Sequence, residues 1–147
     1  MAIPTREQLK KFAAGYVRLW NEGDKEGWRE NWLAVGPGEF KMWDPCGTPP
    51  KFGFEHCAMD SWDLFQKRIR FHTPKETLFF NPGHIAWVMQ NHFEHEGEQT
   101  YSNSVETFEF GEDGSVTIRT YYPVPAHDDK ALGDLFQQYL PENEHGA

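Results

Sequence analysis

The sequence predicts an α+β fold: a cone-shaped roll in which three N-terminal helices pack on a curved, mostly antiparallel sheet. Two observations predict it. Up to about residue 68, apolar residues recur every three or four positions, as on one face of a helix. From Ile69 onward they alternate with polar residues, as in a strand, and Gly, Pro, Asn and Asp cluster between these runs. Helices followed by strands are typical of an α+β domain.

The first helix is predicted by its start signal, its apolar stripe and its stop signal. Thr5 is followed three residues later by Gln8, which is the spacing of a capping box. Gly23 supplies the stop. The apolar residues between them share one helix face: Leu9, Phe12, Ala13, Tyr16, Val17 and Trp20.

Two further helices are expected before the sheet begins. Asp24 can cap a short second helix that places Trp28 and Trp32 on one side, four residues apart. Gly36-Pro37-Gly38 then breaks the pattern. A third helix is expected over about residues 54–68, with Trp62 and Phe65 on its inner stripe.

The strands follow from alternation and turn signals. Residues 39–44 predict a short strand, and the prolines and glycine between positions 45 and 50 force a loop. Later strands are expected over 69–80, interrupted by Pro74, and over 85–93, 100–110 and 116–122. A last helix is predicted over 128–140. Residues 1–140 therefore read as one domain, and residues 141–147 as a flexible C-terminal tail.

Composition excludes several classes of protein. The 147 residues carry 14 Lys and Arg against 23 Asp and Glu, a net charge of −9, which argues against a nucleic-acid partner. No window approaches the roughly 18 apolar residues of a membrane span, and no apolar signal region begins the chain, so we expect a cytoplasmic protein. Cys46 and Cys57 match no zinc or redox spacing, and the seven His residues suggest no metal site.

Aromatic residues number 23, or 16% of the chain, which is more than a small core needs. The surplus could line a pocket for a flat apolar ligand, or it could form a dimer interface.

Three polar side chains interrupt apolar faces: Tyr16 on the first helix, Asp44 at the end of the first strand, and Glu106 on the same side of its strand as Phe108. An apolar cavity raises the pKa of a carboxyl group, which suits it to proton transfer near neutral pH. A protonated carboxyl beside a phenol could donate two hydrogen bonds to a developing oxyanion. Taken singly, each residue has an ordinary structural interpretation: a core tyrosine, a turn aspartate and a solvated glutamate.

Three segments resemble one known family. Residues 16–24, Tyr-Val-Arg-Leu-Trp-Asn-Glu-Gly-Asp, are similar to its first-helix motif, and Asp44-Pro45-Cys46-Gly47 resembles its Asp-Pro-x-Gly loop. Residues 106–116 are similar to the strand and turn that carry its second acid. The family is the ketosteroid isomerase-like, or SnoaL-like, branch of the nuclear transport factor two-like superfamily. The similarity spans about residues 5–123.

The resemblance implies a catalytic scheme that needs no cofactor. Tyr16 would be the phenolic oxyanion donor, Asp44 the general base and Glu106 the protonated acid, although the family has Asp where this chain has Glu. Asn91 could hydrogen-bond a substrate oxygen. The remaining substrate-binding residues expected around the cavity are Trp20, Trp62, Trp87, Met89, Phe93, Phe108 and Arg119.

Two signals disagree on the orientation of Arg119. The resemblance implies that it faces the cavity, where it would ion-pair with Glu106 and ionise it. The apolar neighbours Val116 and Ile118 indicate instead that the opposite face of this strand is the packed one.

The leading hypothesis is a cofactor-independent acid/base enzyme, an isomerase or a lyase/dehydratase, that acts on a hydrophobic aromatic or polycyclic small molecule. The resemblance also implies a homodimer formed through the outer face of the sheet. The alternatives are a non-catalytic binding module for an apolar ligand and a structural dimerisation domain.

Overall fold

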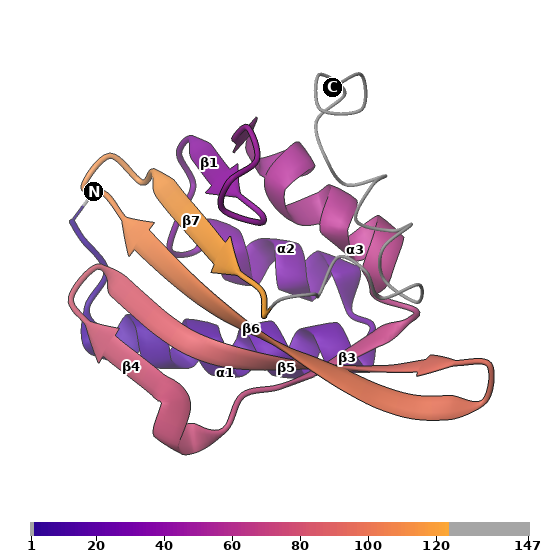
Figure 1. Cartoon of the computed structure of the whole chain (residues 1–147). Helices are drawn as coiled ribbons and strands as arrows, with labels where there is room; N and C mark the ends of the chain where they lie inside the picture. Colours follow the sequence, from indigo (N-terminus) through magenta and orange to yellow (C-terminus); the bar gives the residue numbers. More distant parts are fainter. Residues whose placement is uncertain (1, 124–147) are drawn as a thin grey trace.

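A computed structural model describes residues 2–123 of the chain, and the helix predicted over 128–140 and the tail 141–147 lie outside that range. Three α-helices lie against one side of a strongly twisted seven-stranded sheet (Figure 1). The strand order is β2-β1-β7-β6-β5-β3, and β4 also pairs with β5. Every pair is antiparallel except β1 with β7. The α+β class predicted from the sequence is confirmed.

The first two helices begin and end where their capping residues stand. Helix α1 spans Arg6–Glu22; the Thr5 hydroxyl accepts from the Gln8 N–H at 3.2 Å, and the Gln8 side chain accepts from the Thr5 N–H at 2.8 Å. Gly23 ends the helix with φ 77°, a left-handed conformation that glycine adopts without a steric penalty. Helix α2 spans Lys25–Leu33, and the Asp24 carboxylate caps its first turn.

The third helix differs from the expected regular helix over 54–68. The chain forms a π-helical turn, η1, over Glu55–Met59, and then a short α3 over Asp60–Phe65. Cys57, Ala58 and Met59 are all buried although they are consecutive. The wider π-helical turn rotates less per residue than an α-helix, so three neighbouring side chains can reach the core together.

The strands match the alternation of the sequence, with one addition. Long β5 and β6 form a hairpin whose far end projects past the helices (Figure 1). A 3-10 turn, η2 (Lys75–Thr77), follows Pro74 and divides the predicted strand at 69–80 into β3 and β4. Strand β2 was not predicted, because it is only two residues long and follows a proline-rich loop. The strands are β1 (Phe40–Trp43), β2 (Lys51–Phe52), β3 (Ile69–His72), β4 (Leu78–Asn81), β5 (His84–His95), β6 (Glu98–Phe110) and β7 (Val116–Tyr121).

The core between helices and sheet is largely aromatic. Trp20, Trp28 and Trp32 are each at most 2% exposed. Their neighbouring rings meet mostly edge-on or tilted, which aromatic quadrupoles favour. The indole N–H groups of Trp20 and Trp28 donate to the carbonyls of Ile69 and Tyr16 at 2.9 and 3.1 Å. Many of the surplus rings are therefore core.

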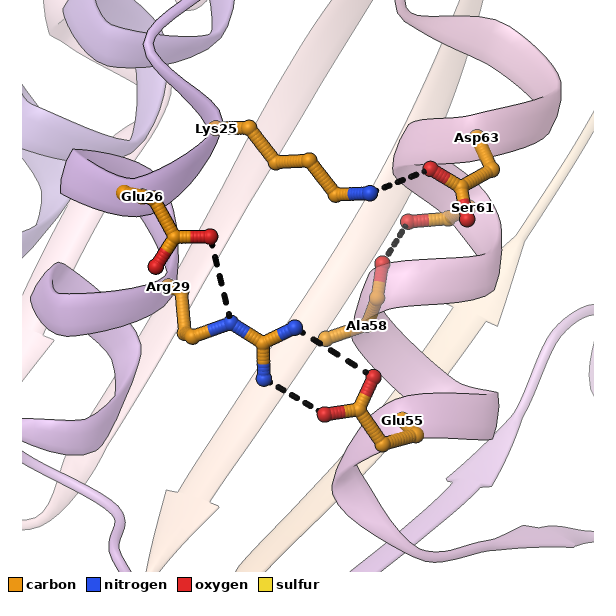
Figure 2. Close-up of polar contacts among 7 residues, drawn as sticks. All are labelled: Lys25, Glu26, Arg29, Glu55, Ala58, Ser61 and Asp63. Carbon is orange, nitrogen blue, oxygen red and sulfur yellow. Dashed lines mark hydrogen bonds and ion pairs between the residues drawn. The ribbon is translucent and has the colours of Figure 1, made fainter.

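Ion pairs tie α2 to the segment formed by η1 and α3 (Figure 2). The Lys25 ammonium donates to Asp63 at 2.8 Å, and the Arg29 guanidinium bridges Glu26 and Glu55. These carboxylates are largely exposed, so each pair contributes on the order of 0–1 kcal/mol. Within residues 2–123, no helix is long and apolar enough to cross a membrane.

Candidate active site

An apolar pocket opens between the helices and the inner face of the sheet. It has a volume of about 70 Å³. Its wall combines rings from α1, α2 and β3 with the η1 turn and the inner faces of β6 and β7. The polar groups on this wall are few: Tyr16, Asp44, Ser61, Asn91, Glu106, Thr120 and Tyr122.

Glu106 lies in the middle of β6, directly opposite Trp87 of β5. The Trp87 indole N–H donates to Glu106 Oε1 at 2.7 Å, and the Ser104 hydroxyl donates to Oε2 at 3.1 Å. The Asn91 amide in turn donates to Ser104 Oγ at 3.2 Å. Each of the two carboxyl oxygens of Glu106 thus accepts a hydrogen bond from a neutral donor.

Burial is the largest influence on this carboxyl group. It raises the pKa of Glu106 from 4.5 to about 7, and the nearby Asp44 charge adds to the rise. The hydrogen bonds from Trp87 and Ser104 act in the opposite direction, because they stabilise the charged form. Near neutral pH both protonation states are populated, so this group can give or accept a proton.

Asp44 directly follows β1, at the start of the proline-rich loop, and is 8% exposed. The Tyr122 hydroxyl donates to Asp44 Oδ1 at 2.8 Å. The Lys51 ammonium donates to the Asp44 backbone carbonyl at 3.0 Å. Parallel pairing of β1 with β7 explains the Tyr122 contact, because it brings the ends of the two strands to the same edge of the pocket.

Tyr16 reaches the pocket from α1. Its ring stacks on Phe71 with centroids 5.5 Å apart and packs at 5.1 Å from the ring of Trp87. Burial raises the pKa of Tyr16 well above its usual 10, and the charges of Glu106 and Asp44 raise it further. The phenol is therefore neutral over the physiological range and remains a hydrogen-bond donor.

The structure places the predicted site residues in three groups. Tyr16, Trp20, Asp44, Asn91, Glu106 and Phe108 line the pocket. A second group is buried in the core without lining it: Trp62, Trp87, Met89 and Phe93. Among these, Trp87 acts on the pocket through its bond to Glu106.

Arg119 forms the third group, because it lies on the outer face of β7. Its guanidinium lies 5.1 Å from the centroid of the Trp43 ring and 3.9 Å from Glu109. The inward orientation implied by the family resemblance, with its ion pair to Glu106, is therefore not what the structure shows. The buried side chains of Val116 and Ile118 occupy the inner face of β7 instead.

Three residues near the pocket were not identified from the sequence: Lys51, Ser104 and Tyr122. Alternation along β7 places Tyr122 in line with the buried Thr120, which is a usable signal. Lys51 had no such signal, because a lysine after two prolines is usually solvated.

A larger hollow lies elsewhere, an open groove of about 570 Å³ between α1 and the η2–β4 segment. Its rim carries exposed cations, including Arg6, Lys10 and Lys75. Unlike the smaller pocket, it is lined by no carboxyl group among the described residues. Within residues 2–123, no group of three or more His, Cys, Asp or Glu side chains is arranged to hold a metal ion.

No protein-family model matches the chain, and no curated protein matches it by sequence. Several solved structures match its fold. SalBIII, an epoxide hydrolase/cyclase-like enzyme with a role in pyran ring formation in the polyether salinomycin, has a TM-score of 0.62 at 15% identity, over 80% of this chain and 92% of that one. A protein assigned as a SnoaL-like polyketide cyclase from Jannaschia sp. CCS1 has a TM-score of 0.60 at 17% identity, over 84% and 90%.

RV0760c from Mycobacterium tuberculosis has a TM-score of 0.59 at 23% identity, over 82% of this chain and 94% of that one. It also matches in its complex with estradiol-17beta-hemisuccinate, at 21% identity over 80% and 95%. The chain thus shares the fold of these solved structures, among them the SnoaL-like protein, in agreement with the α+β fold that its motifs suggested.

Proposed function

We propose that this protein is a cofactor-independent acid/base enzyme, an isomerase or a lyase/dehydratase, that moves a proton on a hydrophobic aromatic or polycyclic small molecule. One observation carries the proposal: two carboxyl groups in different environments, Asp44 and Glu106, share an apolar pocket with the neutral phenol of Tyr16. A pocket built only to bind an apolar ligand would gain nothing from two buried carboxyl groups, because each is costly to desolvate.

In an isomerisation, Asp44 takes a proton from the carbon next to a substrate carbonyl, and the electron pair moves onto the carbonyl oxygen. Tyr16 and protonated Glu106 donate hydrogen bonds to that oxyanion. The proton on Asp44 then returns to a different carbon, so the double bond shifts and no atom is gained or lost.

In an elimination, Asp44 again takes the carbon-bound proton. Protonated Glu106 gives its own proton to the departing hydroxyl group, which leaves as water while the carbon–carbon double bond forms. The pKa of Glu106 at about 7 suits this second role, since a useful fraction is protonated at neutral pH.

Proteins that share the fold support an apolar, polycyclic substrate. RV0760c was crystallised with a steroid derivative, and SalBIII takes part in ring formation. The aromatic wall formed by Trp20, Trp28 and Phe108 offers the same kind of flat surface.

The pocket must widen to admit such a molecule, because ligand pockets usually measure roughly 300–1,000 Å³. We expect the wall formed by η1 and α3, which contributes Cys57, Ala58 and Ser61, to be the one that moves. The ion pairs that tie its outer side to α2 are exposed and weak (Figure 2), so a small displacement costs little.

The test is a panel of enones, hydroxy-ketones and aryl-diols, assayed with the wild-type protein and with Asp44→Asn. We expect turnover of one class by the wild type and its loss in the variant. Binding of these compounds without conversion by either protein would favour the alternative, a non-catalytic binding module.

We also propose that the protein is a homodimer formed through the outer face of the sheet. On that face Val105 of β6 pairs with Tyr121 of β7, and the two side chains are 45% and 46% exposed. Analytical ultracentrifugation is expected to show a dimer that Val105→Glu dissociates. A dimer with no ligand binding in the pocket would favour the third possibility, a structural dimerisation domain.

A further inference from the structure

A buried lysine, Lys51, is hydrogen-bonded to the backbone of the proposed base, Asp44. Lys51 is 1% exposed, although lysine is among the residues most rarely buried. It belongs to β2, a strand of only two residues, and stands opposite Met42 of β1. Because paired residues point to the same face of a sheet, Lys51 is directed inward beside Met42, which lines the pocket.

The hydrogen bond of Lys51 ties it to the residue proposed as the base. Its ammonium donates to the Asp44 carbonyl oxygen at 3.0 Å. The carbonyl and the side-chain carboxyl of Asp44 branch from the same α-carbon, so the positive charge lies close to the carboxyl group. In a site shielded from water, that proximity favours the ionised form of the carboxyl group.

Among the described residues, the other groups with a stated interaction with Asp44 carry no positive charge. Tyr122 donates a neutral hydroxyl, and Tyr16 and Glu106 interact with Asp44 across the pocket. Cys57 on η1 is influenced by both Lys51 and Asp44, in opposite directions; burial dominates and raises its thiol pKa to about 12, so it stays neutral. Among the described residues that line the pocket there is no Lys or Arg.

We propose that Lys51 is a positioning residue that keeps Asp44 ionised as the base and anchors its backbone at the pocket wall. Glu106, which has no such cation beside it among its hydrogen-bond partners, is then left as the acid. This assignment of roles rests on the proposed function. The electrostatic link between Lys51 and Asp44 does not, and it can be measured without a substrate.

The experiment is a carbon-13 NMR titration of the Asp44 carboxyl group, whose signal is identified by its loss in Asp44→Asn. It compares the wild type with Lys51→Met, which removes the charge and the hydrogen bond, and with Lys51→Gln, which keeps a donor without the charge. We expect the Asp44 titration midpoint to rise by one pH unit or more in both variants, a tenfold or greater gain in proton affinity. Lys51→Arg is expected to restore most of the wild-type value.

Two results would overturn the inference. An unchanged midpoint in Lys51→Met means that the lysine has no electrostatic role. A wild-type midpoint in Lys51→Gln means that the hydrogen bond acts and the charge does not.

A reciprocal measurement keeps the test decisive where Lys51 variants fail to fold. In Asp44→Asn, Lys51 loses its anionic neighbour, so the nitrogen-15 signal of its ammonium is expected to titrate at a lower pH than in the wild type. An unchanged Lys51 titration midpoint also refutes the inference.

The outcomes separate the two proposals. If these titrations shift but no compound of the panel is converted, the electrostatic link between Lys51 and Asp44 is supported and the proposed reaction is refuted. If turnover depends on Asp44 but no titration shifts, the proposed reaction is supported and the role of Lys51 is refuted.

Discussion

The two carboxyl groups that line the pocket, Asp44 and Glu106, lie in contrasting surroundings. Asp44 follows a four-residue strand, at the start of a proline-rich loop, with the Lys51 ammonium behind it and the Tyr122 hydroxyl on its carboxylate. Glu106 lies within the 13-residue β6, between β5 and β7, and its two oxygens accept from the neutral donors Trp87 and Ser104.

This difference separates the chemical roles of two similar side chains. A nearby cation favours the carboxylate form, whereas burial favours the acid and at Glu106 outweighs the hydrogen bonds from Trp87 and Ser104. In many enzymes two carboxyl groups act as acid and base because their environments push their pKa values apart. Substitutions near Asp44 and near Glu106 should therefore have different consequences.

The largest effect is expected at the base. Asp44→Asn preserves the shape and an acceptor for the Tyr122 hydroxyl but removes the group that takes the proton, so kcat should fall by about 10²–10⁴-fold. Steady-state kinetics on whichever panel compound is converted measures this. Unchanged circular dichroism and ligand affinity serve as the control, and a rate within threefold of wild type would show that another group is the base.

Removal of the phenol should cost slightly less. Tyr16→Phe deletes one donor to the oxyanion and keeps the ring contacts with Phe71 and Trp87, so we expect a loss of about 10²–10³-fold in kcat with little change in KM. The raised pKa of Tyr16 predicts that the loss is the same at pH 6 and pH 8. A loss confined to one side of neutrality contradicts a neutral phenolic donor.

The acid end should appear in the pH dependence of stability. The folded protein holds the Glu106 proton up to about pH 7, whereas an unfolded Glu loses it near pH 4.5, so the folded state binds more protons between these values. The free energy of unfolding should fall across that window, by roughly 3 kcal/mol at most, and be level above it. Urea unfolding of the wild type and Glu106→Gln from pH 4 to pH 8 measures this; curves that stay parallel would refute the raised pKa.

The smallest effect is expected from the donor to Glu106. Trp87→Phe removes the indole N–H that stabilises the charged carboxylate, so the pKa of Glu106 should rise further, by roughly half a unit to one unit. Carbon-13 NMR titration reports it directly. Trp62→Phe is the matched control, because Trp62 is also a buried ring but forms no hydrogen bond with Glu106; an equal shift in both variants would point to general loosening of the core.

Local patterns in the sequence were sufficient for most elements of the fold. The capping box at Thr5 and the stop at Gly23 place α1, and alternation places Glu106 and Phe108 on the inner face of β6. The same alternation indicated the outward side of Arg119, against the family resemblance. These features depend on neighbours a few residues apart, so the local chain encodes them.

Long-range packing decided the features that the sequence did not predict. The short β2 exists because β1 offers it a partner, and the π-helical turn is the local geometry in which three consecutive residues are buried. Neither has a periodic signature of its own.

The sequence alone determined the fold class, the faces of the helices and long strands, and the three polar groups that interrupt those faces. Only the tertiary structure decided which neighbour each group has: Lys51 and Tyr122 for Asp44, and Trp87 and Ser104 for Glu106. The physical reason is that a carboxyl group's protonation depends on the charges and donors within a few ångströms of it. Tyr122, which lies 78 residues from Asp44 in the chain, comes that close only when β1 pairs with β7.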